Sequence, residues 1–234
     1  MVEPLGNVHL TKALTNGITH IDSAECYNTD YEVAKAIKQS KLLRSDIWIT
    51  DKYFAEDDPY QHLVAALKRL DTPYVYLYLL HSPFIKIKFR GFDLSEAWGF
   101  MERCKKEGMA KNFGVSNFGV EDLKFNQIVF NAFLQNQTPG NNIQLEPYSP
   151  LGPLYKGDLK AGAGKTQILL HWVSAFGIVQ IAITSKETRL AEFLDIFDGF
   201  ELTPEEIEQI TDIGKTYKPV LRQCWKPEYS KFVS

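Results

Sequence analysis

The sequence predicts an α/β fold made of repeated strand–helix units. Short apolar runs at 18–21, 47–50 and 74–81 recur about thirty residues apart. Each run is nearly continuous rather than alternating in polarity, which is typical of parallel strands covered on both faces. Between the runs, apolar residues repeat at helical spacing, near Val33 and near Leu63. The order strand, helix, strand, helix indicates a parallel sheet.

The same alternation continues towards the carboxyl end of the chain. Apolar positions at helical period predict helices over 94–104 and 168–176. A closing helix is expected because Thr-Pro-Glu-Glu at 203–206 combines an N-cap, a first-turn proline and a capping box. Four further segments are predicted as strands: 112–118, 125–130, 143–152 and 178–186.

Polar residues close the first three apolar runs. Asp22, Lys52 and His81 stand at the ends of the runs, and Tyr27 follows the first one closely. Because the carboxyl ends of parallel strands meet at one edge of a sheet, we expect these four side chains to gather there. Barrel enzymes build their active sites in this position.

Charge and composition limit the partners of the chain. Its 26 basic and 29 acidic residues leave a formal net charge of -3, which argues against nucleic acid or an anionic membrane as the main partner. A length of 234 residues with 44% hydrophobic and 24% charged residues suits one globular domain, expected to span 1–234. No extended apolar stripe is left over for an interface, so we expect a monomer.

The sequence also predicts a cytoplasmic protein. No run approaches the roughly 18 apolar residues of a membrane span, and the first ten residues lack the basic and apolar regions of a signal peptide. Cys26, Cys104 and Cys224 are far apart and lack CxxC spacing, so neither a disulfide framework nor a metal site is indicated. We interpret the three cysteines as reduced bystanders.

Seven short motifs occur in order along almost the whole chain. They are HIDSAECYN at 20–28, TDKY at 50–53, LLHSP at 79–83, GVSNF at 114–118, FNQIVF at 125–130, EPYSPLG at 146–152 and ITSKETR at 183–189. Together they resemble the aldo-keto reductases, especially the fungal branch that reduces α-keto amides and conjugated polyketones. The resemblance implies a (β/α)₈ TIM barrel with its site at the carboxyl ends of the strands. It also implies a nicotinamide dinucleotide bound without a Rossmann domain.

Under this resemblance, four residues form the catalytic set. Carbonyl reduction adds a hydride to carbon and a proton to oxygen, and Tyr27 is the expected proton donor. Lys52 would favour the phenolate of Tyr27, and Asp22 would hold Lys52 charged and in place. His81 would donate a hydrogen bond to the substrate oxygen. A plainer interpretation stays open, in which these residues are a structural ion pair, an ordinary tyrosine and a satisfied histidine at a strand end.

The resemblance also assigns residues to the nicotinamide end of the cofactor. Ser116, Asn117 and Gln127 match the positions that hydrogen-bond the nicotinamide carboxamide. Tyr148 matches the aromatic residue on which the nicotinamide ring stacks. Two more matched residues would lie along the pyrophosphate: Ser149 and Leu151.

A second group of matched residues would bind the other end of the cofactor. Lys186 and Arg189 match the pair that binds the 2′-phosphate of the ribose, and two cations suit a monophosphate. Thr184 and Ser185 lie beside them in the sequence, and Glu192 matches a position near the adenine. These residues favour NADPH over NADH, although a solvated charge cluster is the alternative interpretation.

Several crossovers are too short for a complete barrel. Asn117 and Gln127 should end consecutive strands, but only ten positions separate them, whereas a parallel crossover needs about a dozen residues or more. The next crossover, at 131–142, contains Pro139 and Gly140. Two explanations stay open: the sequence joins segments of a longer protein, or the chain is a truncated relative with an incomplete barrel. We favour the first, because removing barrel helices would uncover apolar strand faces.

The expected function is NADPH-dependent reduction of small carbonyl substrates to alcohols. Activated ketones are the expected class, such as α-keto amides, α-keto lactones and diketones, together with aldehydes. The alternative is a regulatory protein of the same fold that binds NADPH with little or no turnover. Replacement of Tyr27 separates the two hypotheses, because only the first needs its hydroxyl group.

Overall fold

The computed structural model describes most of the first half of the chain and parts of the second. The described residues are 7–54, 58–84, 91–119, 121–125, 144–147, 151, 165–182, 184, 187–194, 196 and 201–216. They belong to two compact units, one of Met1–Ile143 with Ile183–Leu190 and one of Gln144–Ala182 with Ala191–Ser234. Each unit has a hydrophobic core of its own. The expectation of a single domain over 1–234 stays a prediction.

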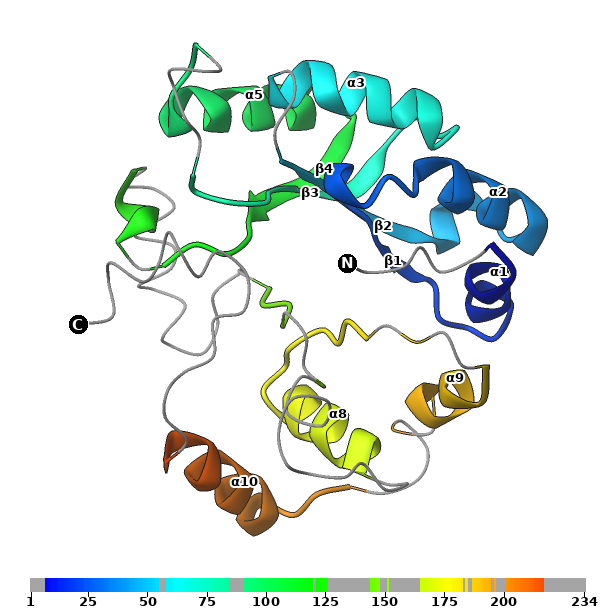
Figure 1. Ribbon diagram of the computed structural model, residues 1–234, viewed down its shortest axis with the longest axis vertical. Helices are drawn as coiled ribbons and strands as arrows, with labels where there is room; N and C mark the ends of the chain where they lie inside the picture. Colours follow the sequence, from blue (N-terminus) through cyan, green and yellow to red (C-terminus); the bar gives the residue numbers. More distant parts are fainter. Residues whose placement is uncertain are drawn as a thin grey trace. The chain divides into compact units, whose positions relative to one another are not determined.

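A parallel sheet of four described strands forms the centre of the first unit (Figure 1). Neighbouring strands follow chain order, β1-β2-β3-β4. Asp22 is in register with Thr50 of β2, and Lys52 is in register with Leu79 of β3. The predicted parallel sheet is therefore confirmed. The strands are β1 His20–Asp22, β2 Trp48–Tyr53, β3 Val75–Leu80 and β4 Ala110–Val115.

Helices alternate with these strands, as the apolar periodicity predicts. Helix α3 packs against α5, and α1 packs against α2. Figure 1 shows α3 and α5 side by side over one face of the sheet. The α-helices are α1 Asn7–Thr15, α2 Asp30–Ser40, α3 Pro59–Arg69 and α5 Leu94–Lys106. The described part of this unit also contains the short 3₁₀ helices η1 Glu25–Tyr27, η2 Arg44–Asp46 and η3 Asp122–Phe125.

The core of the first unit lies between the sheet and these helices. Strand positions such as Ile49 and Leu80 are fully buried there, and so are Leu63 of α3 and Met101 of α5. Burial of one such side chain stabilises the fold by about 2 kcal/mol. Together, these contacts hold the strands in a single register, because a slip by one residue would turn every core side chain to the other face.

The two helices packed over the sheet begin at well-formed caps. The Asp58 carboxylate accepts a hydrogen bond of 2.8 Å from the backbone N–H of Gln61, and Pro59 opens α3. At α5, the Asp93 carboxylate accepts from the backbone N–H of Glu96, and the Glu96 carboxylate accepts from that of Asp93, each at 2.8 Å. This reciprocal pair is a capping box, which satisfies two backbone donors that the helix leaves unpaired.

The second unit contains two of the helices that the sequence predicts. They are α8 Lys165–Ala175 and α10 Pro204–Thr216. At α10, the hydroxyl of Thr203 accepts from the backbone N–H of Glu206 at 3.3 Å, and Glu206 accepts from the N–H of Thr203 at 2.8 Å, so the expected capping box is confirmed. A further helix, α9, spans Glu187–Leu194. Among the described residues of this unit, the core is formed by Leu151, Leu170, Phe193 and Ile196.

The four strands predicted after residue 110 have different outcomes in the structure. Strand β4, Ala110–Val115, includes the first part of the segment 112–118, and most of 125–130 lies outside the described residues. The described residues of 143–152, which are 144–147 and 151, form no strand. The prediction of a strand over 178–186 is wrong for its described part, because 178–182 and 184 form no strand.

A local interaction explains this difference. Val179 makes one backbone hydrogen bond of 3.1 Å, to the carbonyl of Leu145, and a ladder needs a succession of such bonds. The side-chain amide of Gln180 instead donates to the Leu170 carbonyl of α8 at 2.5 Å and to the hydroxyl of Ser174. The described part of the segment is therefore attached to α8 through Gln180.

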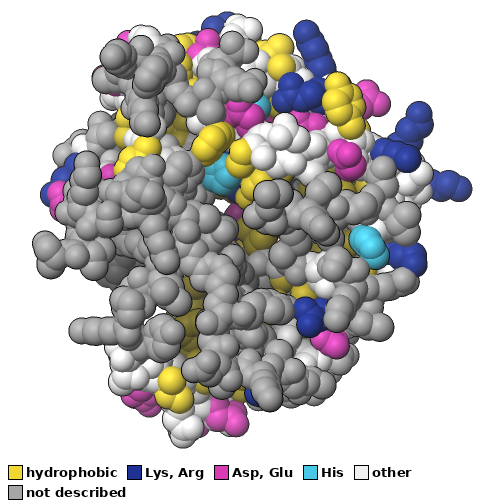
Figure 2. All heavy atoms as spheres, in the orientation of Figure 1, with side chains coloured by type: hydrophobic (Ala, Val, Ile, Leu, Met, Phe, Trp, Pro, Cys, Tyr) yellow, Lys and Arg dark blue, Asp and Glu magenta, His cyan; other side chains and the backbone are white. Residues whose placement is uncertain are grey.

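Charges of both signs lie among one another on the surface. Figure 2 shows basic and acidic side chains interspersed where α2 and α3 lie, in keeping with the small net charge of -3. Within the described residues, no helix is both long and apolar enough to cross a bilayer.

The capping box of α5 leads to a test of the fold. Replacing Asp93 with alanine removes the acceptor for the Glu96 backbone N–H and should lower the free energy of unfolding by about 1 kcal/mol. Urea denaturation measures the change, with Glu102→Ala, at an exposed position of the same helix, as the matched control. An Asp93→Ala variant as stable as the control would show that this cap does not stabilise α5.

Candidate active site

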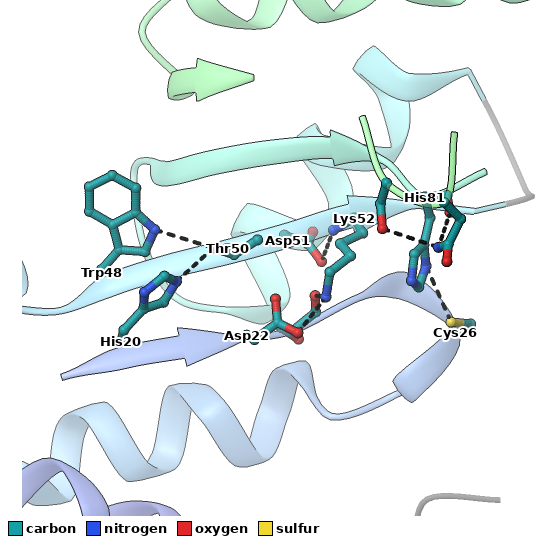
Figure 3. A network of polar contacts seen from close by, with 11 residues as sticks. His20, Asp22, Cys26, Trp48, Thr50, Asp51, Lys52 and His81 are labelled. Carbon is teal, nitrogen blue, oxygen red and sulfur yellow. Dashed lines mark hydrogen bonds and ion pairs between the residues drawn. The ribbon is translucent and has the colours of Figure 1, made fainter. Parts of the chain in front are cut away.

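Four side chains from the first unit meet at the carboxyl edge of the sheet. Asp22 is the last residue of β1, Lys52 lies near the end of β2, and His81 follows β3 directly. Tyr27 ends η1, the short turn that follows β1. Figure 3 shows Asp22 and Lys52 pointing towards each other, with His81 beside them. The structure therefore brings together the residues that the sequence predicts as the catalytic set.

The ion pair between Lys52 and Asp22 lies at the centre of this group. The Lys52 Nζ donates to Asp22 Oδ2 at 2.7 Å and to the carbonyl oxygen of Ser23 at 2.8 Å. Both side chains are largely buried, at 7% and 18% exposure. Burial raises the pKa of Asp22, and the Lys52 ammonium opposes that rise. A buried ammonium with two oxygen partners is held in one place, as a fixed positive charge.

Tyr27 lies next to that charge. The Lys52 Nζ is 5.0 Å from the centre of the Tyr27 ring, and the ring is 38% exposed. The turn that carries it is closed by a backbone hydrogen bond from Tyr27 to Ala24 and by Asn28 in the left-handed conformation, with φ of 53°. The ring of Tyr27 meets that of His81 edge to face, with centroids 5.9 Å apart. An accessible phenol thus lies between a cation and an imidazole.

His81 is held through its backbone on two sides. Its N–H donates to the carbonyl of Tyr53 at 2.9 Å, and its carbonyl accepts from Asn117 Nδ2 at 2.8 Å. Burial, with a smaller effect of Lys52, lowers the pKa of His81 to about 4. The imidazole is therefore neutral at physiological pH and carries one N–H, which it can donate to an oxygen atom.

Two of the predicted cofactor residues lie beside His81. Ser116 continues from β4 and donates its backbone N–H to Leu80 at 2.8 Å. Asn117 has a φ of 61°, and its Nδ2 reaches both the His81 carbonyl and the Ser116 Oγ, the latter at 3.1 Å. A non-glycine residue in the left-handed region is uncommon and requires support from its surroundings. The two hydrogen bonds of Asn117 supply that support.

The other predicted cofactor residues are only partly described. Leu151 is buried in the core of the second unit, where it packs with Leu170. Arg189 and Glu192 lie on α9, three positions apart, which places them on one helical face. Thr184 is described but belongs to no helix or strand. Five predicted residues lie outside the described part of the chain: Gln127, Tyr148, Ser149, Ser185 and Lys186.

Cys26, interpreted from the sequence as a reduced bystander, is a free cysteine that lies beside His81. Its Sγ lies 3.7 Å from Nδ1 of His81, within the range of a sulfur hydrogen bond (Figure 3). The spacing between cysteines cannot predict this contact. The position of Cys26 directly before Tyr27 could have placed it near His81. On the other side of the ion pair, His20 and Trp48 both hydrogen-bond the hydroxyl of Thr50, at 2.9 and 3.2 Å.

Comparison with known proteins agrees with this arrangement. The model of the Aldo/keto reductase family matches residues 5–138. The chain is 41% identical to the NADPH-dependent alpha-keto amide reductase of Saccharomyces cerevisiae, over 92% of this chain and 81% of that protein. This chain belongs to the aldo/keto reductase family. It is thus an oxidoreductase, of the class that reduces carbonyl groups with NAD(P) cofactors.

Other relatives of this aldo/keto reductase support the same fold. It is 33% identical to the glyoxal reductase of Bacillus subtilis, over 87% of this chain and 81% of that protein. A crystal structure of an aldo/keto reductase from Brucella melitensis matches with a TM-score of 0.73 and 31% identity, covering 91% of this chain and 92% of that one. The fold is the TIM barrel of the family, of which the described residues include four parallel strands.

The alignment with the yeast enzyme also bears on the short crossovers. It extends over 254 positions, whereas this aldo/keto reductase has 234 residues, so some positions of the yeast enzyme have no counterpart in this chain. Such gaps agree with the shortened crossovers that the sequence predicts.

The central ion pair leads to a prediction about stability. Lys52→Met leaves the Asp22 carboxylate buried without its cation, and the free energy of unfolding should fall by about 3 kcal/mol near neutral pH. Because burial already raises the pKa of Asp22 and the variant lacks the opposing charge, Asp22 should take up a proton as the pH falls. A folded-state pKa above the unfolded value favours the folded state at lower pH, so the deficit should shrink towards about pH 5.

Urea denaturation of wild type and variant, at about pH 8 and about pH 5, measures the deficit. Lys38→Met, at an exposed position of α2, is the matched control. An equal deficit at the two pH values would contradict the idea that Asp22 carries the penalty.

Proposed function

We propose that this protein reduces small activated carbonyl compounds to alcohols with NADPH, and that Tyr27 donates the proton. The observation that carries the proposal is the meeting of Tyr27, His81 and the Lys52–Asp22 ion pair at one edge of the sheet. Carbonyl reduction needs a proton donor, a hydrogen-bond donor to the oxygen and a positive charge nearby. Each of these requirements has a residue of suitable chemistry.

Bound NADPH would supply the hydride that adds to the carbonyl carbon. As this happens, negative charge develops on the carbonyl oxygen, and the N–H of neutral His81 would stabilise it. The Tyr27 hydroxyl would then give its proton to that oxygen. The Lys52 ammonium, 5.0 Å from the ring centre, stabilises the negative charge that builds up on the phenol as the proton leaves. Asp22 would keep Lys52 oriented throughout.

The chemistry of Ser116 and Asn117 fits a nicotinamide carboxamide. A carboxamide needs a donor for its oxygen and an acceptor for its NH₂ group, and a serine hydroxyl with an asparagine amide can supply both. The hydrogen bond from Asn117 to the His81 carbonyl joins this pair to the catalytic histidine. We therefore propose that the nicotinamide ring lies beside His81, with Gln127 and Tyr148 completing its contacts.

The preference for NADPH rests on residues 184–189 and on the name of the yeast relative. Helix α9 begins at Glu187, directly after Lys186, and Arg189 lies in its first turn. The start of a helix favours phosphate groups, and Lys and Arg add charge. We propose that Lys186 and Arg189 bind the 2′-phosphate, with Thr184, Ser185 and Glu192 nearby. The yeast relative is an NADPH-dependent enzyme by name.

The substrate class comes from the relatives. Their names include an alpha-keto amide reductase, a glyoxal reductase and a methylglyoxal reductase. These substrates share a carbonyl group next to a second, electron-withdrawing carbonyl, which makes the carbon more open to hydride. We propose the same chemical class here, with α-keto amides as the first compounds to test.

The role of Tyr27 is tested by removing one oxygen atom. Tyr27→Phe should lower kcat for an α-keto amide by about 10²- to 10⁴-fold, because the proton donor is lost, while the affinity for NADPH should change little. The control is Tyr31→Phe, at a tyrosine on α2 that is 70% exposed. Stopped-flow measurement of NADPH oxidation and fluorescence titration of NADPH report the two quantities. Tight NADPH binding with no turnover in the wild type would support the regulatory alternative instead.

The cofactor preference is tested by removing the proposed phosphate contacts. Hydrogen bonds to charged groups contribute about 1.5–3 kcal/mol, so Arg189→Met should weaken NADPH binding roughly 10- to 100-fold. NADH binding should stay the same, because NADH lacks the 2′-phosphate. Lys38→Met again serves as the control. A similar loss for both cofactors would show that Arg189 supports the fold rather than the phosphate.

A further inference from the structure

A second charged cluster lies behind the active site, on the other face of β2. Successive side chains of a strand point to opposite faces, so Asp51 points away from Lys52. Asp51 is fully buried, and it faces His62 of α3, which is only 5% exposed. Glu25, the first residue of η1, approaches the same histidine. We call Asp51, His62 and Glu25 the rear cluster.

His62 lies between the two carboxylates of the rear cluster. Its Nε2 is 3.6 Å from Asp51 Oδ2, and its Nδ1 is 3.7 Å from Glu25 Oε1. These distances are too long for hydrogen bonds but short enough for strong ionic attraction in a buried place. The ring itself is packed between aromatic residues, parallel to Tyr78 at 6.2 Å and edge to face with Tyr53 at 6.0 Å. The imidazole therefore has little freedom to turn away.

The second oxygen of each carboxylate holds the backbone at the end of β2. Asp51 Oδ1 accepts from the backbone N–H of Lys52 at 2.9 Å. Glu25 Oε2 accepts from the backbone N–H of Phe54 at 2.6 Å. Glu25 thus attaches η1 to the end of β2, and η1 is the turn that ends in Tyr27. The Phe54 ring meets the His81 ring edge to face at 6.1 Å, so both proposed hydrogen-bond donors to the substrate oxygen are close to this attachment.

The charges around His62 favour its protonated form. Burial alone would lower the pKa of His62, but Asp51 and Glu25 outweigh burial, and the pKa is raised from the ordinary value of 6.5. Arg69 on α3 opposes the rise, although it is paired with Asp30 of α2 at 2.7 Å. Tyr53 and Tyr78 also face the ring, and burial raises the pKa of Tyr78 well above its ordinary value of 10. In its protonated form, His62 lies between two carboxylates and keeps them from repelling each other.

We propose that protonated His62 is a positioning residue, which holds Glu25, and through it the turn that carries Tyr27, against the end of β2. The proposal rests on the proposed function of Tyr27. As the pH rises through the pKa of His62, the proton is lost and the carboxylates of Asp51 and Glu25 face each other across a neutral ring. A histidine whose folded-state pKa is raised stabilises the fold below its unfolded pKa, near 6.5, and loses that effect as the pH rises through the folded value. The turn should loosen over that interval.

The first test is independent of catalysis. Proton NMR of the five histidines as a function of pH gives the pKa of His62. The signal that is absent from the His62→Gln spectrum is assigned to His62. We expect a value above 6.5 in the wild type and a lower value in Glu25→Gln. A pKa at or below 6.5 in the wild type, or no change in Glu25→Gln, would overturn the proposal, whatever the activity of the protein.

The second test separates positioning from general support of the fold. With an α-keto amide and NADPH, kcat of His62→Gln should fall at least tenfold near pH 6.5, because small displacements of a reacting group cost rate, while the KM for NADPH stays within about twofold. The fall in kcat that the wild type shows as the pH rises through the pKa of His62 should be absent from the variant. Glu25→Gln should lower kcat similarly, and the double variant should be no worse than either single variant. Additive losses, or equal pH profiles in wild type and His62→Gln, would contradict the proposal.

Failure of the proposed function and failure of the positioning role of His62 can be told apart. If the wild type binds NADPH without turnover, the proposed function fails, and the NMR titration still decides the charge state of the rear cluster. If His62→Gln does not fold, Glu25→Gln provides the same comparison, because it removes one carboxylate and keeps the side-chain shape. Wild-type kcat in a folded Glu25→Gln variant would overturn the positioning role.

Discussion

The parallel register of β1, β2 and β3 is the constraint on which the site depends. Lys52 can reach Asp22 at 2.7 Å because β1 and β2 run in the same direction and end together. His81 joins them because β3 pairs with β2 in the same sense, and its N–H continues the ladder to Tyr53. A slip of one residue in β2 would place Lys52 in the hydrophobic core and Asp51 in the site. The apolar packing of α3 and α5 against the sheet therefore also keeps the charges of Lys52 and Asp22 in position.

Strand β2 carries opposite charges on its two faces, and each charge has its own partner. Lys52 is neutralised by Asp22 on one face, and Asp51 by His62 on the other. Unpaired, either charge would be costly inside the protein. The two pairs meet in the turn after β1, which contains Ser23, Glu25 and Tyr27. Ser23 accepts from Lys52, and Glu25 approaches His62, so the turn is held from both sides of the sheet.

The sequence predicted those parts of the molecule that depend on local patterns. Continuous apolar runs identified β1, β2 and β3, helical periodicity identified α2, α3 and α5, and Thr203 with Glu206 identified the start of α10. Asp22, Lys52 and His81 could be predicted as neighbours because each follows or ends a strand. The position of Tyr27 came from its motif, since nothing in strand periodicity places a residue in a short turn.

The parts that the sequence did not predict depend on contacts between distant residues. Glu25, Asp51 and His62 come from a turn, a strand and a helix, and no spacing rule connects them. His62 lies on the amphipathic helix α3, and the helical pattern of that helix does not require a histidine at this position. The segment 178–186 has the apolar character of a strand, yet its described part is attached to α8 through Gln180, because strand formation depends on pairing partners as well as on composition.

The stoichiometry of the wild-type reaction with an α-keto amide shows whether the four residues at the sheet edge support carbonyl reduction. NADPH consumed and hydroxy amide formed are quantified in the same sample, by absorbance and by chromatography. We expect turnover in which one molecule of alcohol appears for each NADPH oxidised. NADPH that binds but is not oxidised by α-keto amides, diketones or aldehydes would contradict it, because the four residues at the sheet edge would then be a structural cluster.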